Sequence, residues 1–347
     1  ITFPKSMHWD QGNVQFARPI RRIVALVDDE VLSLIVSGLT AGRTTVGHPS
    51  LAPGEIELAD ASFEGYLDAL REQDVIADIE ERRGIAEREI GQILAEHGGG
   101  IEDPALLDEV TNMVEFPHAV EGRFDERFLQ VPAPVLCAAM KGHQRYFPVR
   151  NEDGDLEAAF VTLANRRPEQ DDLVRQGNER VLRARLNDAE FFWNEDSARP
   201  LEELVPKLAD VVFLGGLGNN LQRTDRLCEL SGQLADMVPG ANRAHVQRAA
   251  YLCKADLLTG LVGEFPDLQG VVGREIALAN GEPAVVAEAI AEHYRPAGAD
   301  DDVPETLEGA VLSIADRIDV IVGCFALGML PTGSQDPYAL RRNALGI

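Results

Sequence analysis

The sequence predicts two domains of different class: an α+β domain over residues 1–199 and an all-α domain over residues 200–347. In the first part, short apolar runs that suit β-strands alternate with helical segments. After residue 199, leucine and valine recur at helical spacing, and no strand signal of comparable strength is present. The 347 residues, 45% of them hydrophobic, are enough to build a core in each of two domains.

Five segments of the first domain have strand character: residues 22–27, 55–59, 114–121, 144–150 and 158–163. The Gly- and Thr-rich segment 41–49 is expected to be an exposed loop. Helices are expected at residues 62–73, which carry an apolar stripe at helical spacing, and at residues 78–97, which end at three consecutive glycines.

The segment 174–193 predicts one long amphipathic helix, because its apolar residues recur every three or four positions. Its other face carries Arg175, Arg180, Arg183 and Arg185, a local reversal of sign in a chain with 32 Lys plus Arg against 58 Asp plus Glu. Such a patch indicates an anionic partner. The alternative is ion pairing within the helix, since Asp172 precedes Arg175 by three residues and Glu179 precedes Arg183 by four.

In the second domain, near-continuous helix is expected over residues 201–234 and again over 243–262. Residues 280–281 and 296–304 are expected loops. The glycine-rich segment 214–218 lacks the Lys-Ser/Thr pair of a phosphate-binding loop, so we expect a simple turn.

The formal net charge of −26 speaks against nucleic-acid binding by the surface as a whole. Binding depends on local patches, however, while bulk charge reports solubility and long-range field. The acidic excess is spread along the chain and is typical of a hydrated surface. A second basic cluster, Arg18, Arg21 and Arg22, is as well suited to acidic neighbours as to phosphate.

Neither a membrane span nor a signal peptide is evident, because no apolar run approaches the roughly 20 residues that a bilayer needs. We therefore expect a cytoplasmic protein without membrane partners. The four cysteines lie far apart in apolar stretches, which favours free, buried thiols over disulfides or zinc ligands.

Eight segments in a fixed order carry a family resemblance: FARPIRRIVAL, AGRTTVGH, MVEFPHAVEG, KGHQRYFPV, QGNERVLRARLNDAEFFW, VPKLADVVF, YLCKADLLTGLVGEFPDLQGVVGR and ADRIDVIVGCFALGMLPTGSQDPYALRRNALGI. Together they span almost the whole chain. The sequence resembles the β subunit of the bacterial two-subunit glycyl-tRNA synthetase. Since the chain starts at Ile1 without methionine, we expect it to be a central portion of a longer subunit, with the family's anticodon-binding segment past Ile347.

The resemblance implies a role in ATP-dependent glycylation of tRNA-Gly, as one part of an α/β glycine-tRNA ligase. Glycine, ATP and Mg are expected at the α subunit, so no catalytic residue and no cofactor are expected here. The implied partners are the α subunit and tRNA-Gly. Arginine suits RNA contact because its planar fork meets phosphate and stacks on bases. The residues expected to contact RNA are Arg175, Arg180, Arg183, Arg185, Lys141, His143, Arg145, Arg166 and Arg167.

The helical half also resembles the HD superfamily of metal-dependent phosphohydrolases, but it lacks the ligands that chemistry needs. The His-Asp position is Ala255-Asp256, the later aspartate is Asp316, and the first histidine falls near Arg223 or Thr224. Two carboxylates alone make a poor transition-metal site. We expect no metal and a degenerate scaffold in which Asp256 and Asp316 make structural hydrogen bonds or pair with arginine.

Two other functions are weighed against RNA recognition. One is an HD-type phosphohydrolase acting on nucleotides or RNA ends, which the missing histidine disfavours. The other is a structural module that supports the α subunit without touching RNA, and the sequence does not separate it from an RNA-binding role. His143, next to Lys141, Arg145 and the aromatic Tyr146 and Phe147, is suited to RNA contact or to a structural hydrogen bond.

Overall fold

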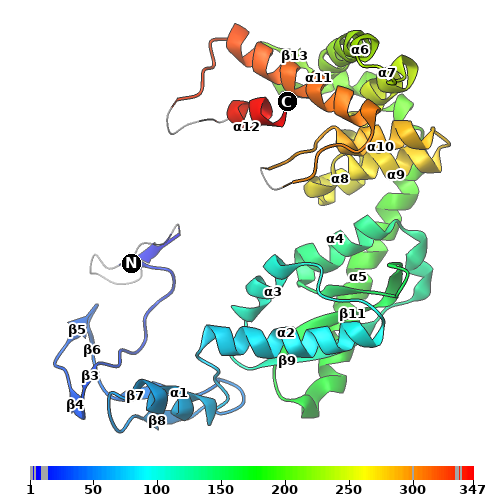
Figure 1. The fold of residues 1–347 in the computed structure, drawn as a ribbon. Coiled ribbons are helices and arrows are strands. Elements are labelled where there is room, and N and C mark those ends of the chain that lie inside the picture. Colours follow the sequence, from blue (N-terminus) through cyan, green and yellow to red (C-terminus); the bar gives the residue numbers. More distant parts are fainter. Residues whose placement is uncertain (1–2, 4, 9–14, 299–300, 333–335, 337) are drawn as a thin grey trace. The chain divides into compact units, whose positions relative to one another are not determined.

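The computed structural model describes residues 3, 5–8, 15–298, 301–332, 336 and 338–347. The chain forms two compact units: residues 1–124 with 144–181, and residues 125–143 with 182–347. Small sheets lie in the N-terminal part and helices dominate the rest (Figure 1). The mixed class agrees with the sequence prediction in this coarse form. The units interleave along the chain, because residues 125–143 cluster with the later segment.

The first unit begins with four short antiparallel pairs: β1 (Met7–His8) with β2 (Gln15–Phe16), β3 (Leu26–Val27) with β4 (Glu30–Val31), β5 (Ile35–Val36) with β6 (Leu39–Thr40), and β7 (Thr44–Val46) with β8 (Glu55–Glu57). The expected strand at 22–27 is regular only at its end. The prediction of a loop over 41–49 was wrong for Thr44–Val46, because these residues form a backbone ladder with Glu55–Glu57.

Three helices follow: α1 (Phe63–Arg71), α2 (Ile79–Glu96) and α3 (Pro104–Thr111). The first two confirm the prediction. Ser62 accepts a hydrogen bond from the Gly65 N–H at the start of α1, and Asp78 accepts one from the Glu81 N–H at the start of α2. The short helix α3 was not expected.

A three-stranded antiparallel sheet in the order β10–β11–β9 forms the centre of the first unit. Its strands are β9 (Pro117–Arg123), β10 (Phe147–Arg150) and β11 (Leu156–Asn165), which confirms the three strands expected in this region. Helices α2 and α3 supply Ile90, Leu94 and Leu107 to a core shared with Val149 and Val161 of the sheet. This packing fixes the segment before α5.

Helix α5 (Asp171–Ser197) is the long amphipathic helix that the sequence predicts, and Leu182, Leu186 and Ala189 are its buried residues. A second helix, α4 (Ala133–Gln144), was not expected. Helix α4 includes Gln144, the first residue of the strand predicted at 144–150. The observed strand begins only at Phe147.

The second unit is mainly a helical bundle of α6 (Asn220–Met237), α7 (Arg243–Leu252), α8 (Gly260–Glu264), α9 (Val271–Ala279), α10 (Ala284–Glu292), α11 (Leu307–Ala326) and α12 (Leu340–Gly346). Helix α6 packs on α7 and α11, and α10 packs on α7, α9 and α11 (Figure 1). The segments at 280–281 and 296–298 are loops, as expected.

Continuous helix over 201–234 was wrong before residue 220. Two 3-10 turns (Leu201–Glu203 and Val205–Asp210) and the hairpin of β12 (Val212–Leu214) and β13 (Gly218–Asn219) precede α6. Gly215, Gly216 and Leu217 form the turn of this hairpin, which confirms the turn expected there. Leu201 and Leu208, which have helical spacing in the sequence, are buried, but they belong to the two 3-10 turns and not to an α-helix.

The four cysteines are free thiols, and Cys253 and Cys324 are buried while Cys137 and Cys228 are partly buried. Burial raises the pKa of Cys253 to about 12, which makes this thiol unreactive at neutral pH. Across the residues that the structure describes, no helix is long and apolar enough to cross a membrane.

Candidate nucleic-acid interface

The four arginines predicted on one face of α5 occupy two kinds of environment. Arg180 and Arg183 are exposed, whereas Arg175 and Arg185 are partly buried. The burial pattern of the helix explains this split, because Arg175 and Arg185 flank the stripe formed by Leu182, Leu186 and Ala189. Arg180 and Arg183 are three residues apart, so they are neighbours on the solvent side of the helix.

Arg175 is held by its own unit. Its Nη1 pairs with Asp172 at 2.7 Å, the intrahelical ion pair that the spacing suggested, and its Nε donates to the Glu121 carbonyl at 2.9 Å. The second suggested pair, between Glu179 and Arg183, is not formed. Glu179 instead accepts a hydrogen bond from the Arg123 backbone N–H at 3.0 Å.

Among the described residues, neither Arg180 nor Arg183 has a side-chain hydrogen bond or a carboxylate within ion-pair distance. Their guanidinium groups are therefore solvated in this structure, and contact with an anion requires no internal bond to break. The structure thus distinguishes Arg180 and Arg183 as the exposed members of the four, without an internal partner among the described residues.

In the second unit, Glu264 lies between Arg185 and His143. Arg185 Nη1 is 4.0 Å from Glu264 Oε1, and His143 Nε2 is 3.8 Å from the same oxygen. The His143 ring also packs against Phe265, with ring centroids 5.8 Å apart. Lys141, two residues earlier in α4, is partly buried. His143 and Arg185 thus share one acidic neighbour that sequence spacing could not reveal.

Three further residues expected to contact RNA lie in the first unit, and each has an internal partner. Arg145 donates to Glu109 at 2.6 Å, and Arg166 donates to Gln170 at 2.7 Å. Arg167 forms a forked pair with Asp74, with Nη2–Oδ distances of 2.9 and 2.6 Å, and Asp74 is only 5% exposed. Arg167 is thereby held by a buried carboxylate, which favours a structural role for this side chain.

The aromatic neighbours of His143, Tyr146 and Phe147, offer no surface to RNA, because both side chains are only 2% exposed. Tyr146 stacks on Phe160 with centroids 4.5 Å apart, and its hydroxyl donates to Asn178 Oδ1 at 2.6 Å. Burial raises the pKa of Tyr146 to about 12. Both rings therefore lie inside the protein, where no base can stack on them.

The structure also gives partners to Asp256 and Asp316, the two carboxylates singled out by the resemblance to the HD superfamily. Asp256 is completely buried, and its Oδ2 accepts the backbone N–H groups of Gly270 and Gly273. Burial raises the pKa of Asp256 to about 6. Asp316 instead pairs with Arg223 at 2.8 Å. Within the described part of the chain, no group of three or more His, Cys, Asp or Glu side chains is arranged to hold a metal ion.

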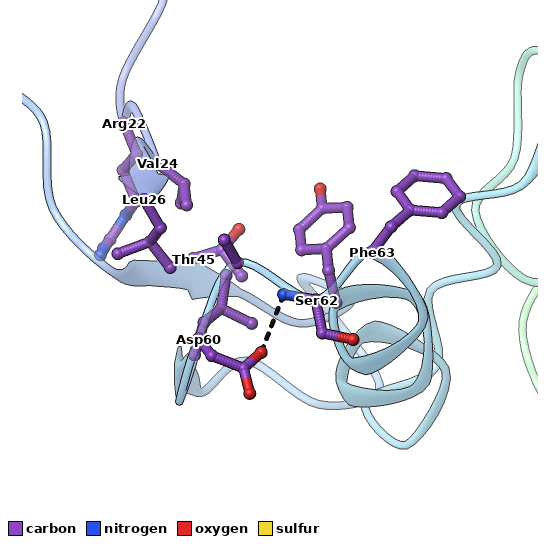
Figure 2. A pocket seen from close by; sticks show the side chains of 10 residues that line it. Arg22, Val24, Leu26, Thr45, Asp60, Ser62 and Phe63 are labelled. Atoms are coloured by element: carbon purple, nitrogen blue, oxygen red, sulfur yellow. Dashed lines mark hydrogen bonds between the residues drawn. The ribbon is translucent and has the colours of Figure 1, made fainter. Parts of the chain in front are cut away.

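The first unit has a shallow hollow of about 460 Å³ beside α1 (Figure 2). Figure 2 shows Phe63 at the start of α1 and the Asp60–Ser62 turn below it, where the Ser62 N–H donates to Asp60 at 2.8 Å. Arg22, from the second basic cluster, lines the hollow and pairs with Glu55 at 2.7 Å. This open site combines one paired cation with acidic neighbours and has no concentration of positive charge.

Comparison with protein families matches residues 1–347 to the family described as "Glycyl-tRNA synthetase beta subunit". The chain belongs to the glycyl-tRNA synthetase beta subunit family. It is 48% identical over 351 residues to the glycine–tRNA ligase beta subunit of Desulforamulus reducens, and 47% identical over 348 residues to that of Geobacter sulfurreducens. Each match covers 100% of this chain and 50% of the relative. The chain therefore spans about half the length of these curated relatives.

One buried cluster of this family member was not found from the sequence. Lys254, only 1% exposed, lies 3.3 Å from Asp316 Oδ1 and 2.8 Å from His293 Nε2. Burial lowers the pKa of His293 well below its ordinary value. Although burial opposes it, the two cations Lys254 and Arg223 hold the pKa of Asp316 below its usual range. The available signal was a lysine within the apolar segment YLCKADLL, in a chain with few lysines.

Proposed function

We propose that this chain contributes tRNA recognition, on the acceptor side, and α-subunit docking to ATP-dependent glycylation of tRNA-Gly. The chemistry itself is assigned to the α subunit, with its ATP and Mg, and the assembled ligase to the cytoplasm. Support comes from the family membership and from relatives named glycine–tRNA ligase beta subunit. In this proposal residues 1–199 form an RNA-recognition domain and residues 200–347 a catalytically degenerate HD-like domain.

The observation that best supports RNA contact is that Arg180 and Arg183 are exposed on α5 and have no internal partner among the described residues. In a chain with a net charge of −26, two such neighbouring cations are a local attraction for phosphate. Lys141, His143, Arg145, Arg166, Arg167, Arg175 and Arg185 form the wider set of proposed contacts. Arg167 and Arg175 rank lowest, because their carboxylate partners compete with phosphate.

Hydrolysis by an HD-type centre is not favoured. One carboxylate oxygen of Asp256 accepts hydrogen bonds from two backbone N–H groups. Asp316 pairs with both Arg223 and Lys254. Cations thus occupy the place where a divalent metal would have to bind, and a second positive charge there would be repelled. The remaining alternative, a docking module without RNA contact, is decided by experiment.

The test is the double variant Arg180→Glu/Arg183→Glu in the full-length subunit, with tRNA-Gly affinity measured over a salt series. We expect affinity to fall about tenfold or more, since each charged hydrogen bond contributes roughly 1.5–3 kcal/mol. The slope of log affinity against log salt should also flatten by roughly 0.7–0.9 for each lost phosphate contact.

The matched control is Arg88→Glu/Arg243→Glu, which changes the net charge by the same amount at two exposed arginines on α2 and α7. This control should keep the wild-type affinity to within a factor of two or so, because screening weakens distant charges. Binding of the α subunit is measured in parallel. If the α5 variant kept its tRNA affinity but bound the α subunit more weakly, this face of α5 would be assigned to α-subunit docking and not to RNA contact.

A further inference from the structure

A polar cavity of about 570 Å³ lies within the second unit and has no role in the proposed RNA surface of α5. Its lining comes from β12, α6, the end of α10, α11 and α12, together with the segment around Asp267 and the loop after His293. The residues that matter for its chemistry are Phe213, Arg223, His293, Tyr294, Asp316 and Arg342. A cavity of this volume is large enough for a mononucleotide-sized ligand.

At the wall of this cavity, Arg223 shares the carboxylate of Asp316 with Lys254, which does not itself line the cavity. Asp316 Oδ1 lies 2.8 Å from Arg223 Nη2 and 3.3 Å from Lys254 Nζ. His293 cannot neutralise Lys254, because its Nδ1 lies 2.6 Å from the Ile290 carbonyl, which only accepts. Nδ1 therefore carries the proton, and Nε2 accepts from Lys254. Asp316 thus lies between two basic side chains, although burial lowers the pKa of Lys254 and the carboxylate Asp267 also lines the cavity.

Arg223 has unused donors in this cluster. Its residue is only 9% exposed, and within the described residues its side chain donates a single hydrogen bond, to Asp316. Its Nε is buried without a hydrogen-bond partner. The nearest other carboxylate, Asp319, is 3.8 Å from that Nε and already accepts two bonds from Arg226. Burying a guanidinium whose N–H donors lack acceptors costs folding free energy, and a bound anion that accepts those hydrogen bonds would offset this cost.

Aromatic rings border the same cations. The Arg223 guanidinium lies 3.9 Å from the centre of the Phe213 ring, and Lys254 Nζ lies 4.3 Å from that of Tyr294. Arg317 fixes this wall, because it donates to the carbonyls of His293, Tyr294 and Pro296. At the edge of the cavity, Arg342 on α12 is exposed and donates to the Ala297 carbonyl at 3.3 Å.

We propose that this cavity binds the phosphate of a nucleotide, with Arg223 and Arg342 on the phosphate and the aromatic wall against the base. A planar fork of N–H donors suits phosphate, and a ring face suits any base. Binding involves no metal and no bond cleavage, because cations stand where an HD centre would place its metal. The nucleotide is either free in solution or the terminal nucleotide of an RNA. The proposal does not depend on the arginines of α5.

The test is calorimetric titration of the full-length subunit with AMP and with inorganic phosphate, in the presence of EDTA. We expect saturable AMP binding, weaker phosphate binding, and a loss of about tenfold or more in AMP affinity for Arg223→Gln. The matched control is Arg243→Gln, at an exposed position of α7 that does not line this cavity, which should bind AMP as wild type does.

Arg342→Gln guards against misfolding of the Arg223 variant, because Arg342 is exposed and its change should leave the fold intact while weakening AMP binding severalfold. Absence of AMP binding to the wild-type subunit would overturn the proposal. So would equal AMP affinity in wild type, Arg223→Gln and Arg342→Gln. A short single-stranded RNA that displaces AMP would assign the site to an RNA end, whereas AMP binding without displacement would assign it to a free nucleotide.

Discussion

Replacement of Asp256 by asparagine should change how the stability of the protein depends on pH. Asp256 is completely buried, and its Oδ2 accepts two backbone N–H groups while its Oδ1 has no partner among the described atoms. Burial raises the pKa of this carboxyl from 3.8 to about 6. Asparagine keeps an oxygen that can accept both N–H bonds, but it does not ionise.

The sign and size of the effect follow from proton linkage. A carboxyl whose pKa is raised on folding favours the folded state below its unfolded pKa, and this advantage is lost as pH rises through the folded pKa. The interval from 3.8 to about 6 corresponds to about 3 kcal/mol at neutral pH. Since Asp316, Lys254 and His293 remain in both proteins, their titration largely cancels in the comparison. The Asp256→Asn variant should therefore gain about 2–3 kcal/mol relative to wild type between pH 4 and pH 7.

Urea unfolding followed by circular dichroism at several pH values between 4 and 7 measures this difference. Asp188→Asn, at an exposed position of α5, is the control and should run parallel to wild type. Parallel curves for Asp256→Asn and wild type would refute the reasoning about burial. Glycylation by the reconstituted ligase should be nearly intact in Asp256→Asn, and a large catalytic loss in the folded variant would contradict the degenerate-scaffold proposal.

Two further substitutions test the packing. Gly270→Ala should destabilise the fold by about 2 kcal/mol more than Gly281→Ala, as measured by urea unfolding. Both glycines have a left-handed φ, of +83° and +81°, but a Cβ would lie 2.7 Å from the Tyr294 ring only at Gly270, so equal losses would contradict the steric argument. Tyr146→Phe should cost about 1 kcal/mol through its lost bond to Asn178 and leave tRNA affinity unchanged, because the ring is buried. Weaker tRNA binding by this folded variant would show that the aromatic ring is accessible after all.

The sequence predicts those elements well whose local signals and tertiary context agree. Helix α1 was expected from its apolar stripe, α2 from the three glycines at its end, and α5 from apolar residues at helical spacing. In the structure Ser62 and Asp78 also cap the first two helices. The prediction of helix before residue 220 was wrong because buried leucines can recur at the same spacing in an α-helix and in irregular backbone. Buried Leu201 and Leu208 belong to 3-10 turns.

The candidate contacts were predicted as residue types but not as environments. An ion pair three residues apart, Asp172–Arg175, could be foreseen from helical geometry. Arg185 with Glu264 and Arg167 with Asp74 join residues far apart in sequence, so spacing carried no information about them. The same holds for Lys254 with His293, which lie 39 residues apart. The structure thus shifts attention from four arginines to Arg180 and Arg183.

The most direct test of RNA recognition within these residues is binding of the purified 347-residue chain to a tRNA-Gly transcript over a salt series. Circular dichroism first establishes that the chain is folded and helical, and a non-cognate tRNA is the control. We predict binding that weakens steeply with salt and favours tRNA-Gly, because charged contacts to phosphate release counterions. No binding by the folded chain at low salt would contradict the account and leave these residues a role in docking the α subunit.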